Sequence, residues 1–276
     1  MAAPSHGSID PSAGSRDTQP AGRPTGTLYV GTSGFAYRSW APAFYPAGAR
    51  ADDLLGYYSA RLPACELNNT FYRQPSPEAV AGWVAATPSS FRFAVKAQRG
   101  GTLRTFADPS PAALAWLTGP LTAFGERLGT VLFRIPGPVL RDDARLAALL
   151  AAWPSALPLT VEAQDASWQV DETFAALAAA GATLCVTELD DPAEPPTLRL
   201  TGSFLYVRLR RSDYAAAELA AWAARLLPFL ADGRDAFVFF RHDEAGEAPG
   251  RALRLAALVA AELPAAVPLP APVGDA

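Results

Sequence analysis

Several residue types are scarce in this sequence of 276 residues, and each scarcity excludes a class of protein. Cys65 and Cys185 are the only cysteines, so a disulfide framework and a cysteine-rich zinc site are both excluded, and a reducing, cytoplasmic location is expected. The two histidines, His6 and His242, are too few for a zinc site with several histidine ligands. No segment reaches the roughly 18 uninterrupted apolar residues that a membrane span requires, so we expect no membrane association.

Charge is also limited, with 23 Lys plus Arg against 27 Asp plus Glu and a formal net charge of −4. This balance argues against a broad basic face that wraps nucleic acid, although it leaves room for a local basic pocket. Lys96 is the only lysine, and Asn68 and Asn69 are the only asparagines. The 50% hydrophobic and 18% charged residues suffice for a sizeable core and predict a folded domain.

The two ends of the chain differ in composition from the middle. Residues 1–26 are rich in Ala, Pro, Ser, Gly and Thr and lack the apolar run of a signal peptide, so we expect a flexible tail. Residues 264–276 are again rich in Pro and Ala and are expected to form a second tail. Residues 27–263 are expected to form a single domain.

Eight short apolar runs in this domain are typical of buried parallel strands. They are Leu28–Ser33, Ala64–Asn68, Phe91–Ala97, Thr130–Pro136, Leu159–Gln164, Thr183–Leu189, Phe204–Arg210 and Phe237–Asp243. Helical patterns lie between them at Ala51–Arg61, Pro77–Ala86, Pro111–Leu128, Asp142–Trp153, Asp171–Ala180, Tyr214–Leu230 and Pro249–Leu263. The alternation predicts an α/β fold, a (β/α)8 TIM-like barrel, with an open doubly wound sheet as the alternative. The interval from Asp190 to Gly202 has no helical pattern, so the sixth helix is expected to be reduced or missing.

Polar residues end every one of these strands, where the active site of such a barrel lies. Glu66 and Asn68 are two residues apart on one strand and so face the same side, and Phe71 and Tyr72 follow them. A carboxylate and an amide in this arrangement suit a polar ligand, whereas a turn at the strand end is the other interpretation, favoured for Asn69. The charges could also pair with one another and close the barrel as a structural ion-pair network.

Lys96 has three interpretations at the end of its strand. It can supply a fixed positive charge for a phosphate or carboxylate, or form a Schiff base with a carbonyl if its pKa is lowered. A simple ion pair with Glu66 or Glu162 is the third. The loop Gly31–Gly34 could expose backbone N–H groups to a phosphate, but no nucleotide-binding motif accompanies it.

We expect no metal and no cofactor, although Mg²⁺ bound by Glu66, Glu162 and Glu188 stays open. A Ser-His-Asp triad would need His242 as its base, and the chain has no nucleophile-elbow motif to go with it.

Several strings together resemble the DUF72, or YecE-like, family of (β/α)8-barrel proteins. They are Gly31–Tyr37 with Trp40, Phe44–Pro46, Glu66–Tyr72, Phe91–Ala97, Val161-Glu162 with Ser167-Trp168, and Tyr206–Leu209. The resemblance spans about residues 27–263 and implies the same barrel, while the family has no settled activity.

The chain departs from the family pattern at four strand ends. Strand five continues Glu162-Ala163-Gln164-Asp165-Ala166 where the family usually has Glu-Phe-Arg-His-Pro, and strand seven ends in Arg210-Arg211 in place of His-Gly. Strand eight ends Arg241-His242-Asp243 in place of Asn-Asn, and Arg134 replaces a common Gln. A divergent member with a more basic pocket is therefore expected.

These observations predict an uncharacterised barrel that binds, and could transform, a small anionic metabolite at the C-terminal face. Catalysis is expected from Glu66, Lys96 and Glu162. Ligand binding is expected from Thr32, Ser33, Asn68, Tyr72, Arg134, Trp168, Arg208 and Arg241. One alternative is a non-catalytic binding or interaction protein derived from an enzyme, and the other is a nuclease-like barrel, which the acidic charge disfavours. The oligomeric state is left open.

Overall fold

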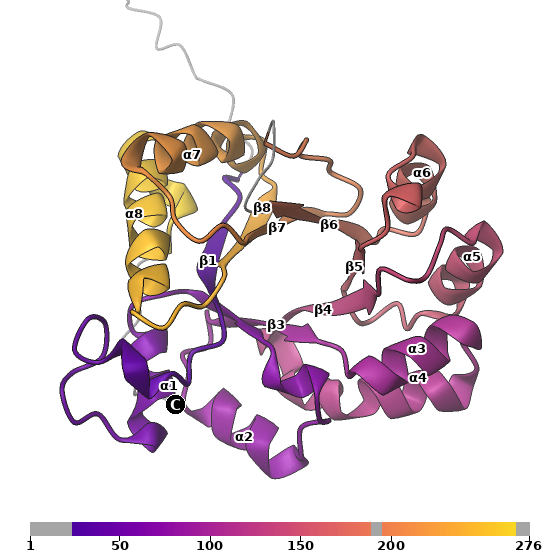
Figure 1. Cartoon of the computed structure of the whole chain (residues 1–276), viewed down its shortest axis with the longest axis horizontal. Coiled ribbons are helices and arrows are strands. Elements are labelled where there is room, and N and C mark those ends of the chain that lie inside the picture. The colour runs from indigo at the N-terminus through magenta and orange to yellow at the C-terminus, as the bar shows by residue number, and fades with distance from the viewer. Residues whose placement is uncertain (1–23, 189–194, 269–276) are drawn as a thin grey trace, which may run out of the picture.

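The computed structural model describes residues 24–188 and 195–268, in which eight parallel strands close into a barrel in chain order (Figure 1). The strands are β1 (Leu28–Ser33), β2 (Ala64–Leu67), β3 (Arg92–Lys96), β4 (Leu128–Ile135), β5 (Leu159–Ala163), β6 (Thr183–Glu188), β7 (Phe204–Leu209) and β8 (Asp235–Phe240). Each coincides with a predicted strand to within three residues at either end, and β8 shows the largest difference, since it ends at Phe240 and not at Asp243. The closed ring confirms the (β/α)8 barrel and rules out the open sheet.

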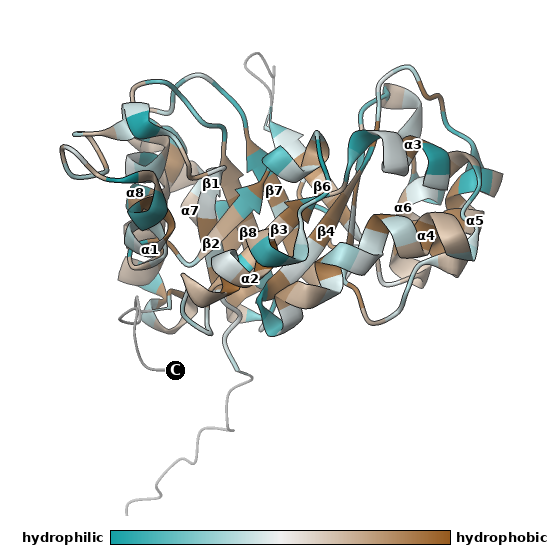
Figure 2. Ribbon diagram, turned by 90° about the horizontal axis from the view of Figure 1, so that it is seen from below, coloured by the Kyte–Doolittle hydropathy of each residue, from teal (hydrophilic) through white to brown (hydrophobic). Residues whose placement is uncertain are grey.

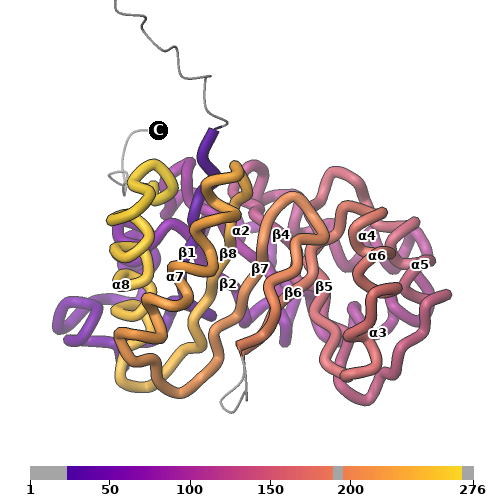
Figure 3. The backbone as a smooth tube through the Cα atoms, turned by 90° about the horizontal axis from the view of Figure 1, so that it is seen from above, coloured from indigo at the N-terminus to yellow at the C-terminus, as the bar shows by residue number. Residues whose placement is uncertain are grey.

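Helices surround the ring of strands in Figure 1, and Figure 3 shows α7 and α8 on one side and α3 to α6 on the opposite side. They are α1 (Leu54–Ser59), α2 (Pro77–Ala85), α3 (Arg99–Ala107), α4 (Pro111–Thr118), α5 (Asp143–Ala152), α6 (Asp171–Ala179), α7 (Ala216–Ala231) and α8 (Glu247–Glu262). Within the described residues no helix is both long and apolar enough to cross a membrane.

Local sequence explains where two of these helices begin. Ser76 and Ser110 each precede a proline, and their hydroxyls accept hydrogen bonds from the backbone N–H of Ala79 and Ala113, so both act as N-caps. Helix α3 was not predicted, because Gly100 and Gly101 weaken its helical pattern; Gln98 caps it through its side-chain oxygen instead.

No helix occurs between β6 and β7 in Pro195–Ser203, in agreement with the expected loss of the sixth helix, and the preceding residues 189–194 lie outside the description. In Figure 1, the side of the barrel between α6 and α7 is where this connection runs. Most of the two predicted tails also lies outside the described residues. Gly26 and Pro264–Ala266 differ from the expectation, because Gly26 N–H donates to Leu230 O (2.8 Å) and Ala266 is fully buried.

Alternation along the strands separates two apolar layers. Residues such as Val30, Val95 and Val207 face outward into the large core beneath the helices, whereas Ala94, Tyr206 and Phe239 fill the barrel interior. Figure 2 shows this hydrophobic character along the strands. On each strand, the residue two positions after the last interior residue faces the same side. At the C-terminal strand ends such residues therefore point into the barrel mouth.

Candidate functional site

Six polar side chains from six strands meet at the C-terminal end of the barrel interior. They are Ser33 of β1, Glu66 of β2, Lys96 of β3, Arg134 of β4, Glu162 of β5 and Arg208 of β7, and we call them the mouth cluster. Strand register places Ser33 beside Glu66 and Arg134 beside Glu162. Lys96 lies two residues after Ala94 of the interior layer, so it faces the lumen as the prediction required.

Arg208 is the centre of the mouth cluster. Its Nη2 donates to Glu66 Oε1 at 2.8 Å, and its Nη1 donates to Glu162 Oε1 at 2.6 Å. The Arg208 side chain is 4% exposed, so both bonds form away from solvent. The planar guanidinium presents its donors in a fixed fork, which sets the separation of the two carboxylates.

Glu66 is fully buried and fully engaged. Besides Arg208, the hydroxyls of Ser33 and Tyr206 donate to its two oxygens, each at 2.7 Å. Burial favours the neutral acid, but the charge of Arg208 and the hydrogen bonds outweigh this effect and lower the Glu66 pKa to about 2. Glu66 is therefore ionised at neutral pH and has no proton to deliver as a general acid.

Glu162 is engaged through one oxygen only. Its Oε1 accepts from Arg208, whereas its buried Oε2 accepts no hydrogen bond from any described residue. Arg134 Nε lies 3.3 Å from this oxygen but outside hydrogen-bonding geometry, and the Arg134 side chain is 27% exposed. Glu162 Oε2 is therefore held by the charge of Arg134 and not by a hydrogen bond.

Lys96 is 6% exposed, and no carboxylate of the described residues lies within 4.0 Å of its Nζ. The ammonium lies instead over the ring of Phe71, 4.3 Å from its centroid. Burial and the nearby charge of Arg208 lower the Lys96 pKa to about 8, although Glu66 and Glu162 act in the opposite direction. Lys96 is therefore mostly charged at pH 7, with roughly a tenth of the amine neutral, and it can exchange protons more readily than an ordinary lysine.

Two residues outside the expected set belong to the mouth. Phe71 contacts both Lys96 and Arg134, whose Cζ lies 5.8 Å from the ring centroid. Tyr72, the expected aromatic, is 79% exposed at the surface. Arg210 is a further cation, and burial together with Arg208 lowers its pKa. The sequence had already indicated Arg210 as part of a more basic pocket, although it was not among the expected binding residues. The choice between Phe71 and Tyr72 depends on a 3-10 turn at Asn69–Phe71.

Three expected ligand-binding residues lie away from the mouth cluster. Thr32 faces outward, where its hydroxyl donates to Gly34 O (2.7 Å) and contacts Tyr58 Oη (2.9 Å). Trp168 is 1% exposed in the core and donates through Nε1 to Val139 O. Tyr72 is the third. Thr32 and Trp168 therefore stabilise the fold, and Tyr72 contacts solvent.

The other expected residues lie at the rim. Asn68 is half-buried and its backbone carbonyl closes the turn at Phe71 N–H, while Asn69 Oδ1 accepts from Thr70 N–H as an Asx-type interaction. Arg241 is exposed, and its charge acts on Arg210.

The three glutamates considered for Mg²⁺ do not converge. Glu188 faces outward and accepts hydrogen bonds from Tyr214 (2.6 Å) and Trp222 (3.4 Å). In residues 24–188 and 195–268, no group of three or more His, Cys, Asp or Glu side chains is arranged to hold a metal ion.

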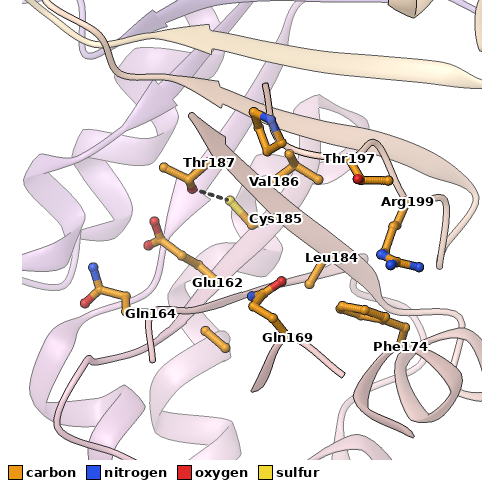
Figure 4. Close-up of a pocket in the computed structure, with 12 residues that line it drawn as sticks. Glu162, Gln164, Gln169, Phe174, Leu184, Cys185, Val186, Thr187, Thr197 and Arg199 are labelled. Atoms are coloured by element: carbon orange, nitrogen blue, oxygen red, sulfur yellow. Dashed lines mark hydrogen bonds between the residues drawn. The ribbon is translucent and has the colours of Figure 1, made fainter. Parts of the chain in front are cut away.

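Two cavities flank the mouth cluster and share Gln164 in their walls. The smaller, of about 210 Å³, is bordered by Arg99, Arg134, Phe71 and Leu103, and we call it the arginine cavity. The larger, of about 460 Å³, extends from Glu162 to Phe174 and Arg199, and we call it the lateral cavity (Figure 4). Both volumes are available to a small molecule that contacts the cluster.

The fold and this charged C-terminal mouth define a (β/α)8-barrel protein with its candidate site in the usual position for the class. Residues 29–273 match the model of the family described as "Protein of unknown function DUF72", and the chain belongs to that family. This confirms the resemblance noted in the sequence. No curated protein matches the chain.

Two solved structures show the same fold. The DUF72 family protein TM1631 from Thermotoga maritima has 24% identity and a TM-score of 0.72, over 84% of this chain and 99% of that one. The DUF72 family protein EF0366 from Enterococcus faecalis has 20% identity and a TM-score of 0.69, over 86% of this chain and 99% of that one. Identities this low establish the barrel alone.

Proposed function

We propose that this protein binds a small anionic metabolite, carrying a phosphate or a carboxylate, in the arginine cavity at the barrel mouth. The observation that carries the proposal is a surplus of positive charge. Among the described residues, Lys96, Arg134, Arg208 and Arg210 act on a cluster whose carboxylates are Glu66 and Glu162. Arg208 is bonded to both carboxylates and Arg134 is paired with Glu162, so four cations share two carboxylates and the excess positive charge attracts an anion.

The lining of the arginine cavity supports this assignment. Arg99 and Arg134 border it together with Phe71, Leu103 and Pro136, and no Asp or Glu side chain of the described residues lines it. Guanidinium groups in apolar surroundings bind phosphate and carboxylate more strongly than in water, because less competing solvent is present.

If the ligand is transformed, the two groups suited to proton transfer are Lys96 and Glu162. Lys96 has a pKa of about 8, and Glu162 keeps an unbonded oxygen. Glu66 holds Arg208 in place and is a positioning residue. The complete engagement of Glu66 favours the second candidate function, a binding protein without turnover, since one of the expected catalytic carboxylates is occupied.

Calorimetric titration with inorganic phosphate tests the proposal. Arg134→Met should weaken phosphate binding by roughly 10- to 100-fold, the value of one charge-assisted hydrogen bond. Arg145→Met is the matched control, because Arg145 is an exposed cation paired with Asp142 (3.2 Å) on α5. Equal affinities in the two variants, or no saturable binding of phosphate to the wild type, would contradict the proposal. Turnover of a bound metabolite would exclude the non-catalytic candidate.

A further inference from the structure

The barrel wall opens between β5 and β6. These two strands pair only at Thr160 with Thr183 and at Val161 with Leu184, whereas β7 and β8 pair from Phe204 to Leu209. Beyond Leu184 the strands therefore separate toward their C-terminal ends. The described part of the next connection, Pro195–Ser203, supplies no helix to cover this side.

The lateral cavity passes through this opening. On β6, Leu184 and Val186 face the outer layer while Cys185 and Thr187 face the interior, yet all four line the same cavity. Successive residues of a paired strand lie on opposite faces of a sheet, so one cavity reaches both faces only where the wall has parted. The cavity connects the surface near Arg199 with Glu162 of the mouth cluster.

The polar groups in the cavity point to hydroxyl groups on a ligand. Figure 4 shows Glu162 and Gln164 on one side, Thr187 above them and hydrogen-bonded to Cys185, and Gln169, Phe174 and Arg199 across the space. Amides and hydroxyls both donate and accept hydrogen bonds, as a sugar hydroxyl does. Glu162 lines the cavity as a carboxylate and can accept a hydrogen bond from such a hydroxyl, although its Oε2 also lies 3.3 Å from Arg134 Nε.

The size of the lateral cavity and the charges around it restrict the class of ligand further. About 460 Å³ falls within the roughly 300–1,000 Å³ typical of small-molecule sites. An ammonium-bearing ligand is disfavoured, because Arg199 lies at the outer end of the cavity and Arg134 lies 3.3 Å from Glu162 at the inner end. Gln164 borders both this cavity and the arginine cavity, so the two cavities adjoin at this side chain.

We propose that the lateral cavity receives the hydroxylated carbon chain of a sugar phosphate or sugar acid whose anionic group binds in the arginine cavity. This inference rests on the proposed function and names its substrate class. The Glu162 carboxylate accepts a hydrogen bond from a ligand hydroxyl, Thr187 and Gln169 bind further hydroxyls, and Arg134 binds the anion.

Calorimetry with a defined panel tests the substrate class. The probes are inorganic phosphate, ribose, ribose 5-phosphate, glucose 6-phosphate, mannose 6-phosphate and 6-phosphogluconate. At least one sugar phosphate should bind about tenfold or more tightly than phosphate, since each added hydrogen bond contributes to affinity. Thr197→Trp fills the cavity from an exposed position and should remove this advantage while leaving phosphate binding unchanged. Thr187→Val, which is close to isosteric, should reduce it in the same direction.

Ser89→Trp is the matched control, because Ser89 is exposed before β3 and borders neither the arginine cavity nor the lateral cavity. If phosphate binds but every sugar phosphate binds no more tightly, or if Thr197→Trp and Ser89→Trp behave alike, the lateral-cavity inference is overturned and the anion site stands. If neither phosphate nor any sugar phosphate binds, the proposed function falls and this inference falls with it. Binding of ribose that Thr197→Trp abolishes, without phosphate binding, would support the cavity and overturn the anion site.

Discussion

Arg208 bridges Glu66 and Glu162, with Nη2 2.8 Å from Glu66 Oε1 and Nη1 2.6 Å from Glu162 Oε1. One buried cation thus neutralises part of the charge of two buried carboxylates contributed by β2 and β5. This bridge gives the mouth cluster a structural role, and the other cations of the cluster are the basis of the anion site that we propose.

Removing the bridge should destabilise the fold. Arg208→Met leaves both carboxylates buried without their partner, and we expect a loss of about 3–5 kcal/mol in the free energy of unfolding. Urea denaturation measures this change. Arg145→Met, at an exposed ion pair, should cost less than about 1 kcal/mol. A similar small loss in both variants would show that the bridge is not a structural element.

Acid stability should depend on Glu66. Its pKa is about 2 in the folded protein and its ordinary value is 4.5, so between these values the unfolded chain binds more protons than the folded one. The contribution of Glu66 to the free energy of unfolding is therefore complete above about pH 4.5 and is lost as the pH falls toward 2. Denaturation curves of the wild type and Glu66→Gln across this interval measure the effect. Parallel pH dependence in the two proteins would contradict the lowered pKa.

An acid placed in the arginine cavity should repel the ligand without harming the fold. Leu103 is 40% exposed and borders the cavity, whereas Leu253 is 38% exposed on α8. Leu103→Glu should weaken phosphate binding by roughly tenfold, and Leu253→Glu should leave it within about twofold. Equal phosphate affinities in these two variants would move the anion site away from this cavity.

The barrel itself was predictable because its signals are local and repeated. Short β-branched and aromatic runs bounded by Gly and Pro mark each strand, and β1 coincides with its predicted range, Leu28–Ser33. The sequence also predicted that Glu66, Lys96 and Arg208 lie at the C-terminal strand ends, but alternation alone left open which face of each strand lies inside the barrel, because a shift of one residue reverses it.

What could not be predicted depends on the tertiary arrangement. Thr32 lies near the end of β1 but faces outward, where its hydroxyl contacts Tyr58. Trp168 lies in a 3-10 helix after β5, where its indole donates to Val139 O in the core. Neither orientation can be read from the local sequence. The incomplete pairing of β5 and β6 leaves no mark in either strand's own sequence, so the lateral cavity was not foreseen. Helix α3 was missed because its capping by Gln98 offsets two glycines.

The structural role of Thr32 gives a contrasting prediction. Thr32→Val removes the hydroxyl that donates to Gly34 O and contacts Tyr58, and should lower the free energy of unfolding by about 1–3 kcal/mol. Phosphate affinity should stay within about twofold of the wild type. Thermal denaturation and phosphate titration of the same variant separate the two effects. A variant of normal stability that binds phosphate poorly would return Thr32 to the ligand site.

The most direct test of the anion site uses the only lysine of the chain. Protein labelled with ¹³C-lysine gives a single side-chain Cε signal, whose pH titration reports Lys96 without further assignment. The account predicts a pKa of about 8 in the free protein, against the ordinary 10.5, and a higher pKa once inorganic phosphate is bound, because a neighbouring anion favours the charged amine. A pKa near 10.5 that does not respond to phosphate would contradict it.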